Sequence, residues 1–177
     1  RLEGLPALIL RPAIVLGAGD WKPTPSGEII LKFLNREYYC YFETKLLLAD
    51  ADDVARAHIS AIRNGRIGEK YSLCDKEPHA LAEIFRILEE ISGIKAPTLK
   101  IPYHLLLWFA YLDEAISGVV FKKKPLMPTE GLRFCRMQLA LDNKKAVEEL
   151  GYTPTDLRET LTKAVNWYRS NGYVKNA

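Results

Sequence analysis

Hydrophobic residues occur along this chain in two spacings, and each spacing predicts a different kind of element. Residues 7–10 form a short continuous apolar run, which is typical of a strand covered on both faces of a parallel sheet. Residues 70–74 form a second such strand, and residues 38–42 and 46–48 are shorter candidates. Two covered parallel strands cannot make a sheet by themselves, so we expect its other strands on a missing segment or a partner chain.

Apolar residues three or four positions apart predict the helices. The predicted helices cover residues 28–34, 52–63, 81–91, 103–117 and 143–150, and a last helix runs from Thr155 or Asp156 to Ser170. An acidic residue at Asp52 or Asp53 can cap the free amides of the second helix, and Gly93 and Gly151 end two others. The helix at 103–117 is strongly apolar, and its Leu107, Trp108 and Tyr111 either line an apolar pocket or belong to the core.

Strands alternate with helices up to about His79, and helices dominate after it. This order predicts an α/β chain with two lobes, residues 1–78 and 79–177.

Charge and composition exclude several classes of protein. The 25 Lys and Arg residues exceed the 22 Asp and Glu residues by only three, and the single basic run, Lys122 to Lys124, is best interpreted as a solvated loop. We therefore expect no nucleic-acid partner. The most apolar stretch, residues 105–111, is far shorter than the roughly 20 residues of a membrane span.

Cysteine and histidine usage favours neither disulfides nor a metal site. The three cysteines lie far apart with no C-x-x-C pair, and the three histidines are scattered: Cys40, Cys74 and Cys135, and His58, His79 and His104. This usage fits a reducing, cytoplasmic compartment.

Four blocks of sequence carry a resemblance to a known family. They are GLPALILRPAIVLGAGD at 4–20, DDVA with Ala57-His58 at 52–58, GEKYSL at 68–73, and a closing block of DNKKA at 142–146, LGYTP at 150–154 and Trp167-Tyr168. In this order they resemble the carboxyl-terminal half of extended short-chain dehydrogenases, the NAD-dependent epimerase/dehydratase family. Residues 19–27 are most similar to hopanoid-associated sugar epimerases and dihydroflavonol-reductase-like proteins.

The resemblance implies a fold and two sets of site residues. Residues 1–78 would be the last part of a Rossmann-like, NAD(P)-binding parallel sheet, and residues 79–177 a small, mainly helical substrate-binding lobe. The nicotinamide ring of NAD or NADP would lie beside Pro12, Ala13, Ile14 and Val15, and the substrate beside Gly19, Asp20, Lys22 and Thr24. The simpler interpretation of Pro12 is a strand terminator without a ligand.

Gly17 and Gly19 are not the start of a dinucleotide fingerprint. That motif needs a third glycine three residues later and a helix starting there, and the chain has Lys22 and then Pro23. The resemblance instead implies a mobile loop beside the substrate.

The family's catalysis depends on a Tyr and a Lys four apart on a helix. Tyr41 and Lys45 have this spacing, but their surroundings predict a strand, in which residues four apart stand about 13 Å from each other. We therefore expect no catalytic residue in this chain, which would be inactive alone. The catalytic pair and most cofactor contacts are expected from an amino-terminal half, in the same polypeptide or a partner chain.

The chain departs from the family pattern at the residues that hold a nucleotide-sugar diphosphate. Leu46 and Leu47 stand where Arg and Asp are common, and Asp50 stands where His is common. Without the arginine no fork-like phosphate contact forms, which favours a non-nucleotide sugar or another carbonyl compound. The expected activity of the whole protein is that of an NAD(P)-dependent epimerase, dehydratase or reductase. The alternatives are a non-enzymatic ligand- or partner-binding module and one half of a split enzyme.

Overall fold

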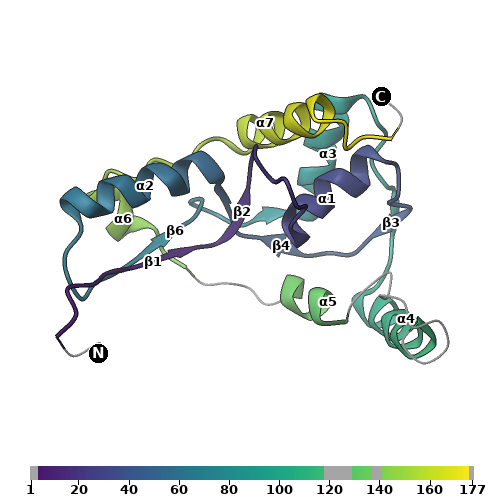
Figure 1. The fold of residues 1–177 in the computed structure, drawn as a ribbon. Helices are drawn as coiled ribbons and strands as arrows, with labels where there is room; N and C mark the ends of the chain where they lie inside the picture. Colours follow the sequence, from purple (N-terminus) through teal and green to yellow (C-terminus); the bar gives the residue numbers. More distant parts are fainter. Residues whose placement is uncertain (1–3, 118–128, 137–140, 176–177) are drawn as a thin grey trace.

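The computed structural model describes residues 4–117, 129–136 and 141–175, with the backbone alone at residues 116, 134 and 135 (Figure 1). The described residues form the strands β1 (Ile9–Pro12), β2 (Ile14–Leu16), β3 (Cys40–Tyr41), β4 (Lys45–Leu46), β5 (Leu48–Asp50), β6 (Lys70–Leu73), β7 (His79–Ala80) and β8 (Leu99–Lys100). The helices are α1 (Pro25–Leu34), α2 (Ala51–Asn64), α3 (Leu81–Ser92), α4 (Tyr103–Ile116), α5 (Thr129–Arg136), α6 (Lys144–Leu150) and α7 (Leu157–Ser170). The basic run at 122–124 and the Cys135 side chain lie outside the described part.

Parallel strand pairs confirm the α/β class. β1 runs parallel to β6 and β2 runs parallel to β5. The chain changes neighbours at Ala13, whose amide donates to the Leu73 carbonyl, while the next amide, of Ile14, donates to the Leu47 carbonyl. The Asp75 amide donates to the Leu48 carbonyl at 2.8 Å, so β6 continues toward β5. The carboxyl ends of these strands therefore meet at one edge.

Side chains that satisfy free amides decide where three helices begin. Thr24 caps α1, Asp50 caps α2, and Asp156 caps α7, each accepting from one or two backbone amides of the first turn. The cap of α2 is thus Asp50, and the predicted acidic start at Asp52 lies one residue inside the helix. Gly151 ends α6 in the left-handed conformation that glycine adopts without strain.

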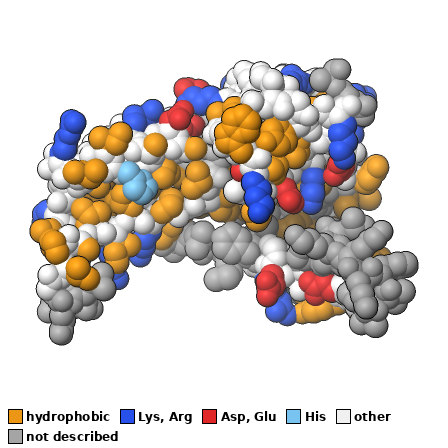
Figure 2. Space-filling model, viewed as in Figure 1, with side chains coloured by type: hydrophobic (Ala, Val, Ile, Leu, Met, Phe, Trp, Pro, Cys, Tyr) orange, Lys and Arg blue, Asp and Glu red, His pale blue; other side chains and the backbone are white. Residues whose placement is uncertain are grey.

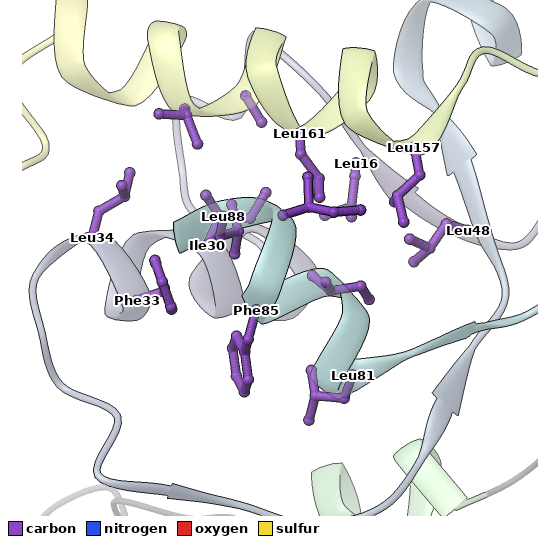
Figure 3. Packing of buried hydrophobic residues seen from close by; sticks show 14 of the residues in the cluster. Leu16, Ile30, Phe33, Leu34, Leu48, Leu81, Phe85, Leu88, Leu157 and Leu161 are labelled. Atoms are coloured by element: carbon purple, nitrogen blue, oxygen red, sulfur yellow. The ribbon is translucent and has the colours of Figure 1, made fainter. Parts of the chain in front are cut away.

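One large core cluster, here called the main core, joins three helices that are distant in sequence. Figure 3 shows side chains of α1, α3 and α7 pointing toward one another, with Leu16 of β2 and Leu48 of β5 beside them. The fully buried members include Ile30, Phe85, Leu88 and Leu161. Burial of so many large apolar side chains is the main source of stability in this part of the molecule.

Two smaller clusters hold the remaining elements. In one, α2 and α6 pack on β6 through Ala57, Ala61, Tyr71, Leu73, Ala146, Leu150 and Tyr152. In the other, α4 and α5 meet through Phe42, Leu106, Ala110 and Leu132. Figure 1 shows α4 and α5 set apart from α1, α3 and α7. The main core combines residues from both sides of position 78, so the division into residues 1–78 and 79–177 stays a prediction.

Candidate functional site

A pocket of about 250 Å³ opens at the carboxyl ends of β2 and β5. It is lined by Val15, Leu16, Gly17, Ala18, Gly19, Asp20, Thr24, Ser26, Gly27, Ile30, Ala51 and Tyr168. This edge is where open α/β sheets bind ligands, because loops rather than strands follow there. The pocket is therefore the candidate site of this chain.

Two contacts fix the backbone around the pocket. A Cβ on Gly17 would lie 2.8 Å from the Cβ of Ala51, so only glycine lets the loop pass so close to the start of α2. The Ser26 hydroxyl donates to the Val15 carbonyl at 2.8 Å, which ties the first turn of α1 to β2. The pocket wall is thus built from a loop, a strand and two helix starts held against one another.

The Asp20 carboxylate is the polar centre of the pocket wall. It accepts from the Thr24 amide at 3.0 Å, from the Thr24 hydroxyl at 3.0 Å and from the Tyr168 hydroxyl at 2.7 Å. Tyr168 is completely buried, and burial together with the Asp20 carboxylate raises the pKa of its hydroxyl. The Tyr168 hydroxyl therefore keeps its proton and acts as a donor to Asp20.

Gly27 makes this arrangement possible. It lies in the first turn of α1, is buried, and faces both the Asp20 carboxylate and the Tyr168 hydroxyl. A Cβ at this position would overlap both groups, so any larger residue would separate α7 from the loop.

Aromatic contacts from the end of the chain anchor the same loop at a second point. The rings of Trp21 and Trp167 meet edge to face with centroids 5.2 Å apart. The Tyr173 hydroxyl donates to the Trp21 carbonyl at 2.6 Å. The loop that was predicted to be mobile is therefore fastened to α7 and to the residues that follow it.

The structure brings together half of the residues predicted for the two sites. Val15 of the predicted nicotinamide wall lines the pocket, as do Gly19, Asp20 and Thr24 of the predicted substrate loop. The other predicted residues do not line it: Pro12, Ala13, Ile14 and Lys22. Pro12 ends β1 and is exposed, and Lys22 is exposed on the loop.

The sequence did not identify several pocket residues: Ser26, Gly27, Ile30, Ala51 and Tyr168. Tyr168 carried one signal, its place in the closing Trp-Tyr pair of the family signature. Nothing in its neighbourhood along the chain indicated that it meets Asp20, because the two residues are 148 positions apart.

Tyr41 and Lys45 lie on separate short strands, as expected from their surroundings, and not on a helix. Tyr41 belongs to β3 and packs its ring edge on Phe85 of the main core, while Lys45 is exposed on β4. Leu46 and Leu47, at the positions where the family often has Arg and Asp, are buried.

The two buried acids of the Asp-Asp-Val region join elements. Asp50 accepts from the Thr160 hydroxyl at 2.8 Å, and Asp53 accepts from the Thr155 amide at 2.6 Å and the Thr155 hydroxyl at 2.9 Å. Both contacts connect the start of α2 to the start of α7. These carboxylates therefore have a structural role in the described part of the molecule.

His79 and Asp75 form a second polar pair near the carboxyl end of β6. The Nε2 atom of His79 lies 2.9 Å from a carboxylate oxygen of Asp75, and this hydrogen bond raises the pKa of His79. Among residues 4–117, 129–136 and 141–175, no three His, Cys, Asp or Glu side chains gather as metal ligands would. Within the same ranges no helix has both the length and the apolar character to cross a membrane.

Comparison with known proteins places the chain in a family. It is 36% identical over 177 residues to a Synechocystis protein provisionally named as a dihydroflavonol 4-reductase, covering 98% of this chain and 51% of that protein. It is 28% identical to sterol demethylase protein B of Methylococcus capsulatus, over 98% of this chain and 53% of the relative. Short-chain dehydrogenase/reductase family 42E member 1 of Bos taurus is 30% identical, over 93% of this chain and 44% of the relative. No family model matches the chain.

Solved structures agree with these relatives. A nucleoside-diphosphate-sugar epimerase from Pseudomonas aeruginosa superposes with a TM-score of 0.74 at 30% identity, over 97% of this chain and 51% of the epimerase. A Bacillus cereus UDP-glucuronic acid 4-epimerase solved with NAD shares the fold, with a TM-score of 0.64 at 20% identity, over 94% of this chain and 46% of that one. The chain thus spans about half the length of the relatives it matches. The chain corresponds to the carboxyl-terminal half of relatives of the extended short-chain dehydrogenase/reductase type.

Proposed function

We propose that this chain is the substrate-side half of an NAD(P)-dependent oxidoreductase or epimerase. The observation that carries the proposal is the pocket at the carboxyl ends of β2 and β5, in a chain that matches reductases and epimerases along nearly its whole length. Residues 12–15 would form a wall of the nicotinamide site. Gly19, Asp20 and Thr24 would face the substrate, with Lys22 at the outer rim of the loop.

The exposed side of β1 supports a role for a further segment. In the described part of the chain β1 pairs with β6 alone, and Ile9 is 43% exposed. Parallel strands are usually covered on both faces and paired on both edges. Figure 2 shows hydrophobic side chains gathered on the end of the molecule formed by α2 and β1. The nucleotide-binding part, in the same polypeptide or on a partner chain, would pair with β1 here.

The cofactor, NAD or NADP, would take most of its contacts from that other part. The nicotinamide ring of the cofactor would accept the hydride from an alcohol substrate or, when reduced, donate it to a ketone, and the catalytic Tyr-Lys pair would come from the same part as the cofactor contacts. The role left for the present chain is to position the substrate. The fixed carboxylate of Asp20 and the hydroxyls of Thr24 and Ser26 are the polar groups available for this at the pocket.

The test is nicotinamide-nucleotide binding by the natural protein purified from its source, together with its intact mass. We expect a mass about twice that of this chain, as the relatives' lengths suggest, and enhanced fluorescence of bound NADH or NADPH. The 177-residue chain alone should show no turnover. A natural protein of this chain's own mass that binds neither nucleotide would instead support a non-enzymatic module. Co-purification of a second polypeptide with a glycine-rich loop would support a split enzyme.

A further inference from the structure

The pocket has a charge pattern that restricts its ligand. Among the described residues that line it, none is Lys, Arg or His, and Asp20 is the single carboxylic acid. The nearby Lys163 faces Asp50, Asp52 and Glu159 at 3.5, 3.6 and 3.2 Å, so acids of α2 and α7 already surround its charge. Phosphate groups are bound in proteins by Arg, Lys or a row of free amides. The pocket lacks such side chains and already contains a carboxylate.

The polar groups of the pocket suit a neutral hydroxyl that donates, because the Thr24 and Ser26 hydroxyls already donate to Asp20 and to the Val15 carbonyl. The Thr24 and Ser26 hydroxyls lie 3.1 Å apart at its wall, next to the Asp20 carboxylate. The rest of the lining is apolar or small, including Val15, Leu16 and Ile30. A site with apolar walls and a few fixed polar groups binds an apolar body and orients one polar substituent.

The positions at which the family often has Arg and Asp agree with this pattern. They hold Leu46 and Leu47, which are buried and offer no charge to a phosphate. Placing a diphosphate against Asp20 without a cation would leave charges uncompensated, which is unfavourable.

We propose that the pocket binds the reacting ring of an uncharged, largely apolar cyclic alcohol or ketone, and not a nucleotide sugar. This inference rests on the proposed function and narrows its substrate class. The pocket volume of about 250 Å³ is sufficient for a ring-sized part of such a compound. The names of two relatives, a dihydroflavonol reductase and a sterol demethylase protein, refer to compounds of this kind.

The experiment compares two probes on the natural full-length protein by NMR, following the backbone amides of Ala18 and Gly19. The probes are taxifolin, an uncharged dihydroflavonol, and UDP-glucose. Ala51→Leu places a larger side chain in the pocket, and Ala18→Phe blocks it from the loop without changing a helix. Ala55→Leu, on the exposed side of the same helix as Ala51, is the matched control.

Taxifolin is expected to shift the amide resonances of Ala18 and Gly19 in the unmodified protein and in Ala55→Leu. In Ala51→Leu and Ala18→Phe we expect no such change on adding taxifolin, because the pocket is filled. UDP-glucose is expected to bind at least roughly tenfold more weakly. Shifts by UDP-glucose at equal or lower concentration would overturn the inference, as would the absence of any shift with taxifolin. Nucleotide binding by the natural protein is measured separately, so failure of the substrate class and failure of the proposed function give different results.

Discussion

Helices α3 and α4 are both rich in large apolar residues, but the structure uses them in opposite ways. In α3 the large apolar residues Leu81, Ile84, Phe85, Ile87 and Leu88 are buried, and charged residues occupy the outer face. In α4, Leu106 and Ala110 are the buried members, while Trp108 is 57% and Phe109 51% exposed. Figure 1 shows α3 between α1 and α7, and α4 beside α5 away from them.

The contrast between α3 and α4 shows that the extent to which a helix is buried depends on how its apolar residues are arranged around it, and not on their number. The apolar residues of α3 repeat at helical spacing on one face, so the face that enters the core is specified by the sequence. Those of α4 surround the helix, and the sequence therefore specifies no single buried face. Trp108 and Tyr111, which we expected either in a pocket or in the core, are exposed and do not line the candidate pocket.

The largest effect expected from this comparison is on stability. Phe85→Ala should lower the free energy of unfolding by about 3–5 kcal/mol, because it removes a fully packed ring from the main core. Trp108→Ala should cost about 1 kcal/mol or less, since more than half of that side chain is already in water. Urea unfolding measures both, and equal losses would show that α4 is as tightly held as α3.

A second prediction concerns the polar contact that holds the start of α7 against α2. Asp53→Ala should destabilise the chain by about 2–3 kcal/mol, because it leaves the Thr155 amide and hydroxyl without their buried carboxylate. The neighbouring Asp52→Ala is the control, since the Asp52 side chain is largely exposed. If both variants unfold at the same urea concentration, the main core does not depend on this contact.

Tyr168→Phe should have a smaller effect, about 1–1.5 kcal/mol, because it keeps the packed ring and removes one hydrogen bond to a carboxylate. The amides of the pocket loop should also exchange with deuterium faster, since Asp20 loses a partner on α7. Tyr173→Phe, which removes a bond to the Trp21 carbonyl, serves as the comparison at the second anchor. Unchanged exchange in Tyr168→Phe would mean that the aromatic contacts alone hold the loop.

The smallest expected effect is a pH dependence at the start of α3. His79 lies immediately before that helix and faces the acids Asp75, Glu83 and Asp156, and its folded-state pKa is raised, mainly by its hydrogen bond to Asp75. Protonated His79 therefore stabilises the fold fully below the ordinary value of about 6.5, and this stabilisation is lost as the pH rises through the raised pKa.

His79→Gln should flatten the unfolding free energy over this pH window, whereas substitution of the exposed His104 on α4 should leave the curve unchanged. If the curve of His79→Gln follows that of the unmodified chain, another group causes the pH dependence.

Much of the fold could be predicted from the sequence because local patterns specified it. The apolar run ending near Pro12 and the run at 70–74 became the parallel pair β1 and β6, and the periodic helix at 81–91 became α3 within one residue. Helix α5 was not predicted, because eight residues are too few for a repeat of apolar positions to stand out in the sequence.

The candidate site was only partly predictable. Gly19, Asp20 and Thr24 form one short segment and were identified together, but their partner Tyr168 comes from the far end of the chain. Contacts between side chains so far apart in the sequence depend on how α7 packs across α1. The spacing of residues within either segment does not predict that packing. For the same reason the sequence could not show that Asp53 binds Thr155, 102 positions away.

The most direct test of the account is oxidation of NADH or NADPH by the natural protein with a panel of uncharged cyclic ketones. The account predicts that at least one ketone drives oxidation, that Ala51→Leu abolishes it while nucleotide binding remains, and that Ala55→Leu retains it. Turnover that is unaffected by Ala51→Leu, or that occurs with UDP-sugars alone, would contradict the assignment of this pocket to an uncharged substrate.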